Sequence, residues 1–256
     1  MHVTIRQSTP HYYATRRAHY AFIIGFHDGY VRPHNPLTRA HIATIIFRLM
    51  PHTDRAHYWA QQNPFPDVSL NQWFNNAIST VTNAGIFTGM PDGTFQPQRH
   101  ITRAELAVSV VRKSGAAPTT TGTPAFNDLE GHWAAGYINT AAANGWITST
   151  VGADGYFRPN QVATRAEAAA LFNRMLNRLP ETEHDLLPGM VTFPDNMDRR
   201  TWYYLYIQEA SNSHNYTMNA NNRHETWTSL IRPELPWHVL ERPYSLPGDL
   251  FRSSNR

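Results

Sequence analysis

One short motif occurs three times along the 256-residue chain, and its internal spacing is constant. Each copy contains an Asp-Gly turn, then an aromatic residue or Val followed two residues later by Pro, then Thr-Arg-Ala, and the Arg lies eleven positions after the Asp. The copies align without a gap, which chance does not produce, so the sequence predicts a repeat architecture. They span Gly25–His41, Gly89–Glu105 and Val151–Glu167.

A second element, Phe-x-Asp followed by Trp, also occurs three times, at Phe65, Phe126 and Phe193. Each copy begins a predicted helix, at about 71–84, 132–144 and 199–212. In a complete unit the Phe-x-Asp element forms the first half and the Asp-Gly motif the second half. The chain therefore begins with a second half alone, continues with two complete units, and ends with a first half alone. Because uncapped repeats leave apolar faces in water, we expect the two orphan halves to meet and close a pseudo-threefold of three units.

The predicted fold is mainly α-helical, a pseudo-threefold spindle with short loops and an irregular C-terminal tail. The spacing divides the chain into an N-terminal segment (1–21), the second half of a split unit (22–52), two complete units (65–115 and 126–180), the first half of the split unit (193–216) and the tail (217–256). A short connecting helix is expected over 53–62. Small and apolar positions on one face of the second helices predict the core, namely Ala40, Ala43, Ile46, Ala104, Ala107, Val110, Ala166, Ala169 and Phe172.

The end of the repeated motif predicts helix starts. In two copies the Thr and the Glu three residues later fit a capping box, which starts helices at about 103–114 and 165–178. The first copy has His41 in place of the Glu. A protonated His cannot accept the hydrogen bond, so we expect this cap to be weaker by about 0.5–1 kcal/mol.

The motif Arg occupies the first position of each of these helices, where an exposed cation costs about 0.3–1 kcal/mol beside the helix dipole. Because this unfavourable arrangement occurs in all three copies, it indicates a functional role for the Arg. Beside free helix amides, a guanidinium fork can hold a carboxylate through two hydrogen bonds, and the Asp-Gly turns let a ligand approach the backbone. The candidate anion-binding residues are Arg39, Arg103 and Arg165, with Asp28, Gly29, Asp92, Gly93, Asp154 and Gly155.

Structural interpretations of the same residues stay open. The three Arg residues could pair with the three Asp residues of the turns. Trp73, Trp133 and Trp202 lie at similar places in the first helices, where such residues are more typical of core anchors than of platforms that stack on a sugar. The three Phe residues of the second element are expected to pack.

Composition excludes several classes of protein. With 22 Lys and Arg against 19 Asp and Glu, and no basic clusters, nucleic acid is not an expected partner. The absence of Cys excludes disulfides and Cys-ligated metal sites. The longest early apolar run, Ala21–Phe26, is too short for a membrane span or the core of a secretory signal. If the mature protein is exported, we expect its leader to lie outside this sequence.

These motifs resemble the S-layer homology domain, whose repeats carry Phe-x-Asp, Trp, then Gly-x-Pro-Asp-Gly-x-Phe-x-Pro and Ile-Thr-Arg-Ala-Glu. The likeness covers roughly residues 20–180 and 193–216, and the copy at Gly89–Glu105 is nearly ideal. The resemblance implies a non-catalytic bacterial cell-surface module that binds a pyruvylated, acidic cell-wall polysaccharide in grooves between units. It places the motif Arg residues on the pyruvyl carboxylate, and it adds Glu105, Glu167 and the three Trp residues as candidate ligand contacts.

Three other functions remain as alternatives. A wall glycan hydrolase would need a carboxylate pair, yet the repeated acids already have turn and cap roles. A calcium module would need several oxygen ligands per loop, whereas each loop offers one Asp. A structural module could instead self-associate in a surface layer without binding glycan. We predict no enzyme activity, no cofactor and no metal.

Overall fold

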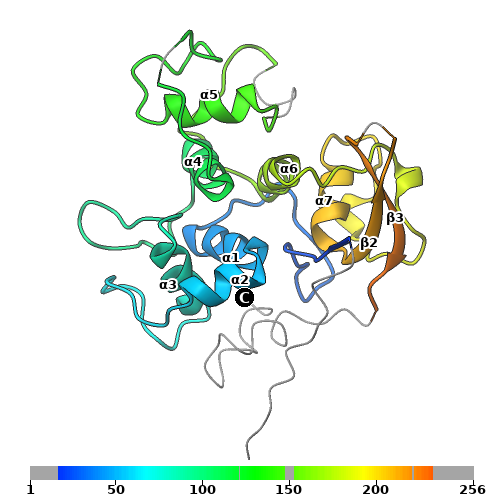
Figure 1. The fold of residues 1–256 in the computed structure, drawn as a ribbon, viewed down its shortest axis with the longest axis horizontal. Coiled ribbons are helices and arrows are strands. Elements are labelled where there is room, and N and C mark those ends of the chain that lie inside the picture. The colour runs from blue at the N-terminus through cyan, green and yellow to red at the C-terminus, as the bar shows by residue number, and fades with distance from the viewer. Residues whose placement is uncertain (1–16, 121, 148–152, 221, 233–256) are drawn as a thin grey trace, which may run out of the picture.

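The computed structural model describes residues 17–120, 122–147, 153–220 and 222–232. Three helices that begin at the motif Arg residues lie at the centre of Figure 1: α1 (Arg39–Leu49), α4 (Arg103–Ser114) and α6 (Arg165–Met175). Two of these helices were predicted from their capping boxes. The bounds of α4 are those predicted, and α6 ends three residues before its predicted end. The small and apolar core positions predicted from the repeats are all buried.

Three outer helices begin after the Phe-x-Asp elements and pack against the central ones. They are α3 (Asn75–Asn83), α5 (Ala135–Ala143) and α7 (Tyr204–Ser211), each shorter than predicted. The pairs are α1 with α3, α4 with α5, and α6 with α7, so that each central helix packs on the outer helix that follows it in the chain (Figure 1). The connecting helix α2 spans His52–Tyr58.

A closed ring of three backbone hydrogen bonds joins the residues that precede the three Thr caps. The amide of Leu37 donates to the carbonyl of Ala163 (3.1 Å), that of Ala163 to Ile101 (2.9 Å), and that of Ile101 back to Leu37 (2.9 Å). Each amide therefore finds its partner in another unit. This arrangement confirms the predicted pseudo-threefold, because equivalent atoms make equivalent bonds around one axis.

The orphan halves meet, as expected. The Asp195 carboxylate accepts hydrogen bonds from the amides of Val31 (3.1 Å) and Arg32 (2.7 Å), more than 160 residues away. Asp67 binds the amides of Phe95 and Gln96 in the same way, and Asp128 those of Phe157 and Arg158. In each loop the second of these residues has positive φ, 52° to 57°, a strained backbone that the carboxylate compensates.

Packing closes the split unit at the same place. A Cβ added to Gly25 would lie 2.4 Å from Cε1 of Phe193, and one added to Gly89 would lie 2.3 Å from Cε1 of Phe65. The first glycine of each of these two loops is thus required for close approach of the Phe ring. Phe193, from the C-terminal half of the split unit, therefore packs on the loop of the N-terminal half in the same way as Phe65 packs on the loop of its own unit.

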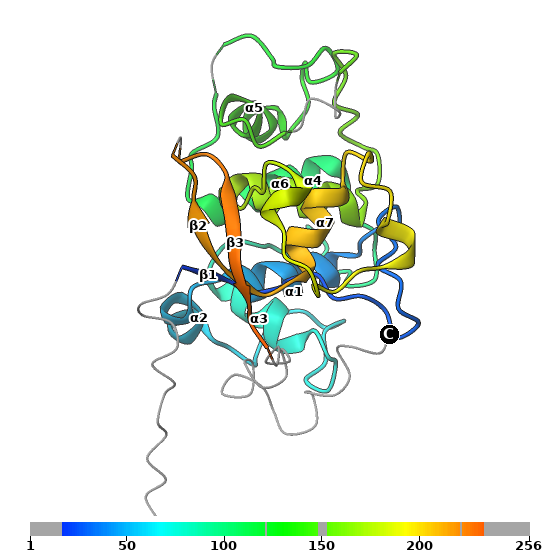
Figure 2. The same ribbon diagram turned by 90° about the vertical axis from the view of Figure 1, so that its right-hand side faces the viewer.

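The expectation of an irregular tail from residue 217 is wrong for its described part. A hairpin of β2 (His214–Met218) and β3 (Glu225–Leu230) pairs antiparallel, and β1 (Ala18–His19) adds to the edge of β2 (Figure 2). The hairpin packs on α7 through Trp227 and Tyr204. Alternating Thr and aromatic residues favour a half-buried strand here, a pattern that the four Pro residues farther along obscured. Residues 233–256 and 1–16 lie outside the described residues.

Among the described residues, two short 3₁₀ turns lie at Glu183–Asp185 and Pro194–Asn196. In the described part of the chain, none of the helices is long and apolar enough to cross a membrane.

Candidate functional site: three grooves between the units

Three surface grooves lie at equivalent places around the pseudo-threefold axis. Each is lined by a motif Arg from one unit, the residue at the third helical position of the next unit, and the Trp of the unit after that. The groups are Arg39, Glu105 and Trp133; Arg103, Glu167 and Trp202; and Arg165, His41 and Trp73. Apart from His41, these are candidate residues that the sequence analysis selected separately, and the structure brings them together.

The guanidinium of Arg39 is held by the loop of the next unit. Its Nε donates to the carbonyl of Phe95 (2.7 Å) and its Nη2 to that of Thr88 (2.8 Å), while the rings of Phe87 and Phe95 lie 4.7 Å from its central carbon. Nη1 lies 3.8 Å from Oε1 of Glu105. Burial lowers the pKa of Arg39 to about 10, so the group remains charged at neutral pH. This groove, with the open solvent at its mouth included, spans about 830 Å³.

Arg165 repeats this arrangement across the split unit. Its Nε donates to the carbonyl of Val31 (2.7 Å) and its Nη2 to that of Ile24 (2.9 Å), and the ring of Phe26 lies 5.1 Å away. Burial lowers its pKa to about 10. The groove, measured in the same way, spans about 580 Å³ and is also lined by Arg48.

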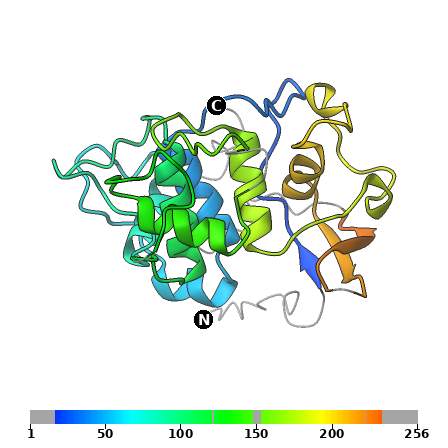
Figure 3. The same cartoon turned by 90° about the horizontal axis from the view of Figure 1, so that it is seen from above.

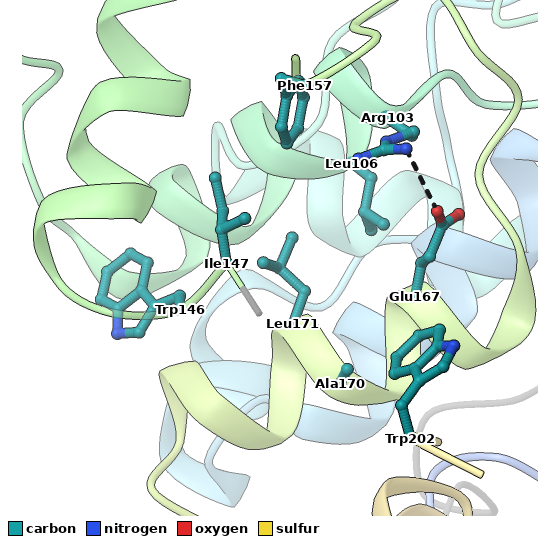
Figure 4. Close-up of a pocket in the computed structure, with 9 residues that line it drawn as sticks. All are labelled: Arg103, Leu106, Trp146, Ile147, Phe157, Glu167, Ala170, Leu171 and Trp202. Atoms are coloured by element: carbon teal, nitrogen blue, oxygen red, sulfur yellow. Dashed lines mark ion pairs between the residues drawn. The ribbon is translucent and has the colours of Figure 1, made fainter. Parts of the chain in front are cut away.

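The Arg103 groove is smaller, at about 340 Å³, and largely apolar. Figure 4 shows the guanidinium beside Phe157, with Nη1 3.6 Å from Oε1 of Glu167. Nη2 is buried and has no hydrogen-bond partner among the described residues, which do not include 148–152. A buried donor without a partner costs free energy, and a ligand oxygen would satisfy it.

Two expectations about these Arg residues are wrong. The helix amides beside them are not free, because the amides of Arg39 and Ala40 donate to the carbonyls of Arg99 and Pro97, and the other two helices begin in the same way. The motif Arg residues also do not rely on the Asp residues of the turns. Asp28 pairs with Arg32 and Asp154 with Arg158, each four residues along its own loop, and Asp92 accepts from Thr94 and Gln96.

The Asp-Gly turns therefore lie apart from the groove linings. Asp28, Gly29, Asp92, Gly93, Asp154 and Gly155 shape the loops, whose other residues carry the carbonyls that hold Arg39 and Arg165. In each copy the Asp side chain closes the turn by accepting from the amide two residues later.

The Trp residues border the grooves. Trp133 is 64% exposed, whereas Trp73 and Trp202 are half-buried. An exposed indole at the rim of a groove is a suitable surface for stacking on a sugar ring, so the structure does not place Trp133 in the role of a core anchor.

The family profile of the S-layer homology domain matches residues 64–107 and 125–169. The chain belongs to this family. It is 33% identical over 208 residues to the "Cell surface glycoprotein 1" of Acetivibrio thermocellus, a match that covers 77% of this chain and 9% of that protein. It is 34% identical over 209 residues to the "Cellulosome-anchoring protein" of the same organism, covering 80% and 45%. An "S-layer protein" of Bacillus licheniformis is 32% identical over 151 residues, covering 57% and 16%. The chain thus spans less than half the length of each.

Sequence reasoning missed one repeated residue of these S-layer homology units. An Arg follows the motif Arg by nine residues in every copy, at Arg48, Arg112 and Arg174. Arg48 and Arg112 line two of the grooves, whereas Arg174 donates to the carbonyl of Gly145 (2.7 Å). Alignment of the copies beyond the motif would have found it.

His41 was also not among the candidate site residues, and its cap forms in full. Its Nδ1 accepts from the amide of Thr38 (3.2 Å), so the capping box is complete. Burial, with the nearby charges of Arg165 and Arg48, lowers the pKa of His41 to about 4. The ring is neutral at pH 7 and replaces Glu as acceptor, which is the physical reason that the expected weakening does not follow.

The lowered pKa of His41 predicts an acid-dependent loss of stability. The unfolded chain, with a His pKa of about 6.5, takes up the proton before the folded chain does, so stability present above pH 6.5 is lost as pH falls toward 4. We expect His41 to account for a fall of about 1–3 kcal/mol in the free energy of unfolding. In His41→Gln, whose amide oxygen keeps the cap, this part of the fall disappears. Urea unfolding of both proteins between pH 4.5 and 7.5 measures the free energy of unfolding. If that free energy depends on pH equally in both proteins, this role of His41 is excluded.

Proposed function

We propose that this chain is a non-catalytic anchoring module at a bacterial cell surface, which binds an anionic, pyruvylated cell-wall polysaccharide in the grooves between its units. Family membership and the names of its relatives, a cell surface glycoprotein, a cellulosome-anchoring protein and an S-layer protein, support an anchoring role. The grooves support the chemistry, because carboxylates and sugar rings suit guanidinium groups and indoles respectively.

One observation carries the proposal: three guanidinium groups are held in equivalent grooves by aromatic rings, and in two of the grooves also by backbone carbonyls. Maintaining an Arg in a mostly buried position costs desolvation, which is visible in the lowered pKa of all three. Groups fixed before binding lose little side-chain entropy when a ligand arrives. A carboxylate that enters such a groove meets a positioned cation and an aromatic wall.

Charge distinguishes the three grooves. Glu105 and Glu167 face Arg39 and Arg103 across their grooves and compete with an incoming anion. In the groove of Arg165 the equivalent position is the neutral His41, and Arg48 adds a second positive charge. We therefore propose that the Arg165 groove attracts an anionic ligand most strongly.

The carboxylates of the repeats favour binding over hydrolysis. Asp67, Asp128 and Asp195 each accept two backbone amides, and Glu105 and Glu167 complete capping boxes. A hydrolase needs one acid with a raised pKa opposite a second carboxylate, and the grooves described here offer one carboxylate or none. We expect no release of reducing ends from wall glycan.

Cosedimentation with isolated cell walls tests the anchoring role. The chain is expected to sediment with walls that retain their secondary polysaccharide, and to remain in the supernatant with walls from which acid extraction has removed it. Binding to both preparations equally would contradict the proposal. Sedimentation of the chain without walls would instead support the alternative of self-association.

A further inference from the structure

Two His and two Glu side chains meet in the small sheet, away from the lining residues of the grooves. His19 comes from β1, His214 from β2, Glu225 from β3 and Glu209 from α7, elements that lie side by side in Figures 2 and 3. One ligand atom from each side chain falls within 4.8 Å of all the others. The side chains of Glu209, His214 and Glu225 are fully buried, and that of His19 is 14% exposed. We call these four residues the His–Glu cluster.

The distances within the His–Glu cluster fit one small cation. Nδ1 of His19 lies 3.2 Å from an oxygen of Glu209 and 3.2 Å from an oxygen of Glu225. Nε2 of His214 lies 3.3 Å and 3.1 Å from the other oxygens of the same two carboxylates. Four ligands at about 2.0–2.1 Å around a tetrahedral Zn²⁺ are about 3.3 Å apart. The two nitrogens face different oxygens of each carboxylate, so each of these four pairs is at ligand spacing, and the four ligand atoms, one from each side chain, lie within 4.8 Å of one another.

Hydrogen bonding fixes the tautomer of His214. Its Nδ1 lies 2.9 Å from the carbonyl of Asn212, which can only accept, so Nδ1 carries a proton. In the neutral ring Nε2 then presents a lone pair to the carboxylate oxygens of Glu209 and Glu225. Three acceptors that face one another call for a cation between them, and metal-binding His residues commonly donate their other ring N–H to a carbonyl in this way.

Two atoms of the cluster face each other without a well-formed hydrogen bond. Among the described residues, Nδ1 of His19 and Oε2 of Glu225 are buried, lie 3.2 Å apart and make no hydrogen bond of good geometry. Burying a polar atom without a partner is costly. A bound cation would satisfy both atoms.

Neighbouring groups orient one of the carboxylates. Nε of Arg178 donates to Oε1 of Glu209 (3.0 Å), and the indole N–H of Trp227 donates to Oε2 (2.9 Å). Trp227 also stacks on the ring of His214, with centroids 4.0 Å apart, and Tyr216 stacks on His19. Arg178 supplies one positive charge against two carboxylates, so a net negative charge remains in the buried cluster when both His rings are neutral.

We propose that His19, Glu209, His214 and Glu225 bind one Zn²⁺ in a closed, structural site. Imidazole nitrogen and carboxylate oxygen are ligands that Zn²⁺ accepts, and a set of four protein ligands is typical of structural rather than catalytic zinc. The ion fastens β1, near the start of the described chain, to the hairpin and α7 near its end. It thereby reinforces the closure that Asp195 makes in the split unit.

Zinc titration of the full chain tests this site. After removal of metals with a chelator, the protein is expected to take up one equivalent of Zn²⁺ in competition with a chromophoric chelator. Zn²⁺ at about a hundred times its dissociation constant is expected to raise the melting temperature by about 5–10 °C. Co²⁺ in place of Zn²⁺ is expected to give the visible absorption of a tetrahedral site.

Matched variants distinguish the cluster from the other His residues. His19→Gln and Glu225→Gln are each expected to weaken Zn²⁺ binding at least about tenfold and to abolish the Co²⁺ absorption. His57→Gln, which removes an exposed His from α2, is expected to change neither. If Glu225→Gln fails to fold, His19→Gln decides, since its side chain lies at the edge of the cluster. The proposal is overturned if the unaltered chain takes up no tight equivalent, which would mean that protons hold the cluster, or if His19→Gln retains it.

Discussion

Replacing Arg165 with Gln is expected to weaken binding to purified wall polysaccharide by at least about tenfold. A charge-assisted hydrogen bond contributes about 1.5–3 kcal/mol, and 1.4 kcal/mol corresponds to a factor of ten. Arg165 is the motif Arg whose groove carries two positive charges and no carboxylate. Calorimetric titration of both proteins with the same polymer preparation measures the loss.

Arg32→Gln is the matched control for this variant. It removes one positive charge from the loop that holds Arg165, but Arg32 pairs with Asp28 and does not line the groove. We expect its affinity to stay within about twofold of the unaltered chain. Arg165→Lys keeps the charge and loses the planar fork, so its affinity should lie between the two. Equal affinities for Arg165→Gln and Arg32→Gln would remove Arg165 from the site, provided that circular dichroism shows both variants folded.

Replacing Asp195 with Asn is expected to lower the free energy of unfolding by about 2–4 kcal/mol and the melting temperature by about 5–10 °C. The carboxylate accepts two amides, and an Asn side chain can accept only through its oxygen while its own N–H groups face the other donor. Because this contact joins the two halves of the split unit, its loss opens that unit. Thermal unfolding measures the size of the effect.

Asp67→Asn provides the comparison for the split unit. It removes the same pair of bonds inside a continuous unit, to Phe95 and Gln96. Both variants should lose similar stability, but only Asp195→Asn should increase hydrogen exchange in Phe22–Val31 and α7 together. A melting temperature within 1 °C of the unaltered chain for Asp195→Asn would show that the halves are held by other contacts.

The repeated residues predicted the architecture well, because they encode contacts within and between units that are made three times. Spacing alone identified the central helices, their caps and the meeting of the chain ends, since each rests on local hydrogen bonding or on an apolar face. The exact partners of each motif Arg were beyond this reasoning. Arg39 and Arg165 donate to carbonyls of a neighbouring loop. Because every residue has a backbone carbonyl, the sequence does not indicate which residues make these contacts.

Two further features depend on tertiary structure. The neutral state of His41 follows from its burial beside Arg165 and Arg48, which a protonation argument from the isolated sequence cannot supply. The His–Glu cluster draws His19 and Glu225 together from the two ends of the described chain, and neither residue belongs to a repeated motif. Pairing of β1 with the hairpin determines that meeting.

Titration of purified wall polysaccharide, intact and after mild acid removal of its pyruvyl ketals, tests the central claim most directly. If the grooves recognise the carboxylate, the intact polymer binds the unaltered chain and removal of the ketal weakens binding at least about tenfold. Equal affinity for both polymers would contradict recognition of the acid by Arg39, Arg103 and Arg165.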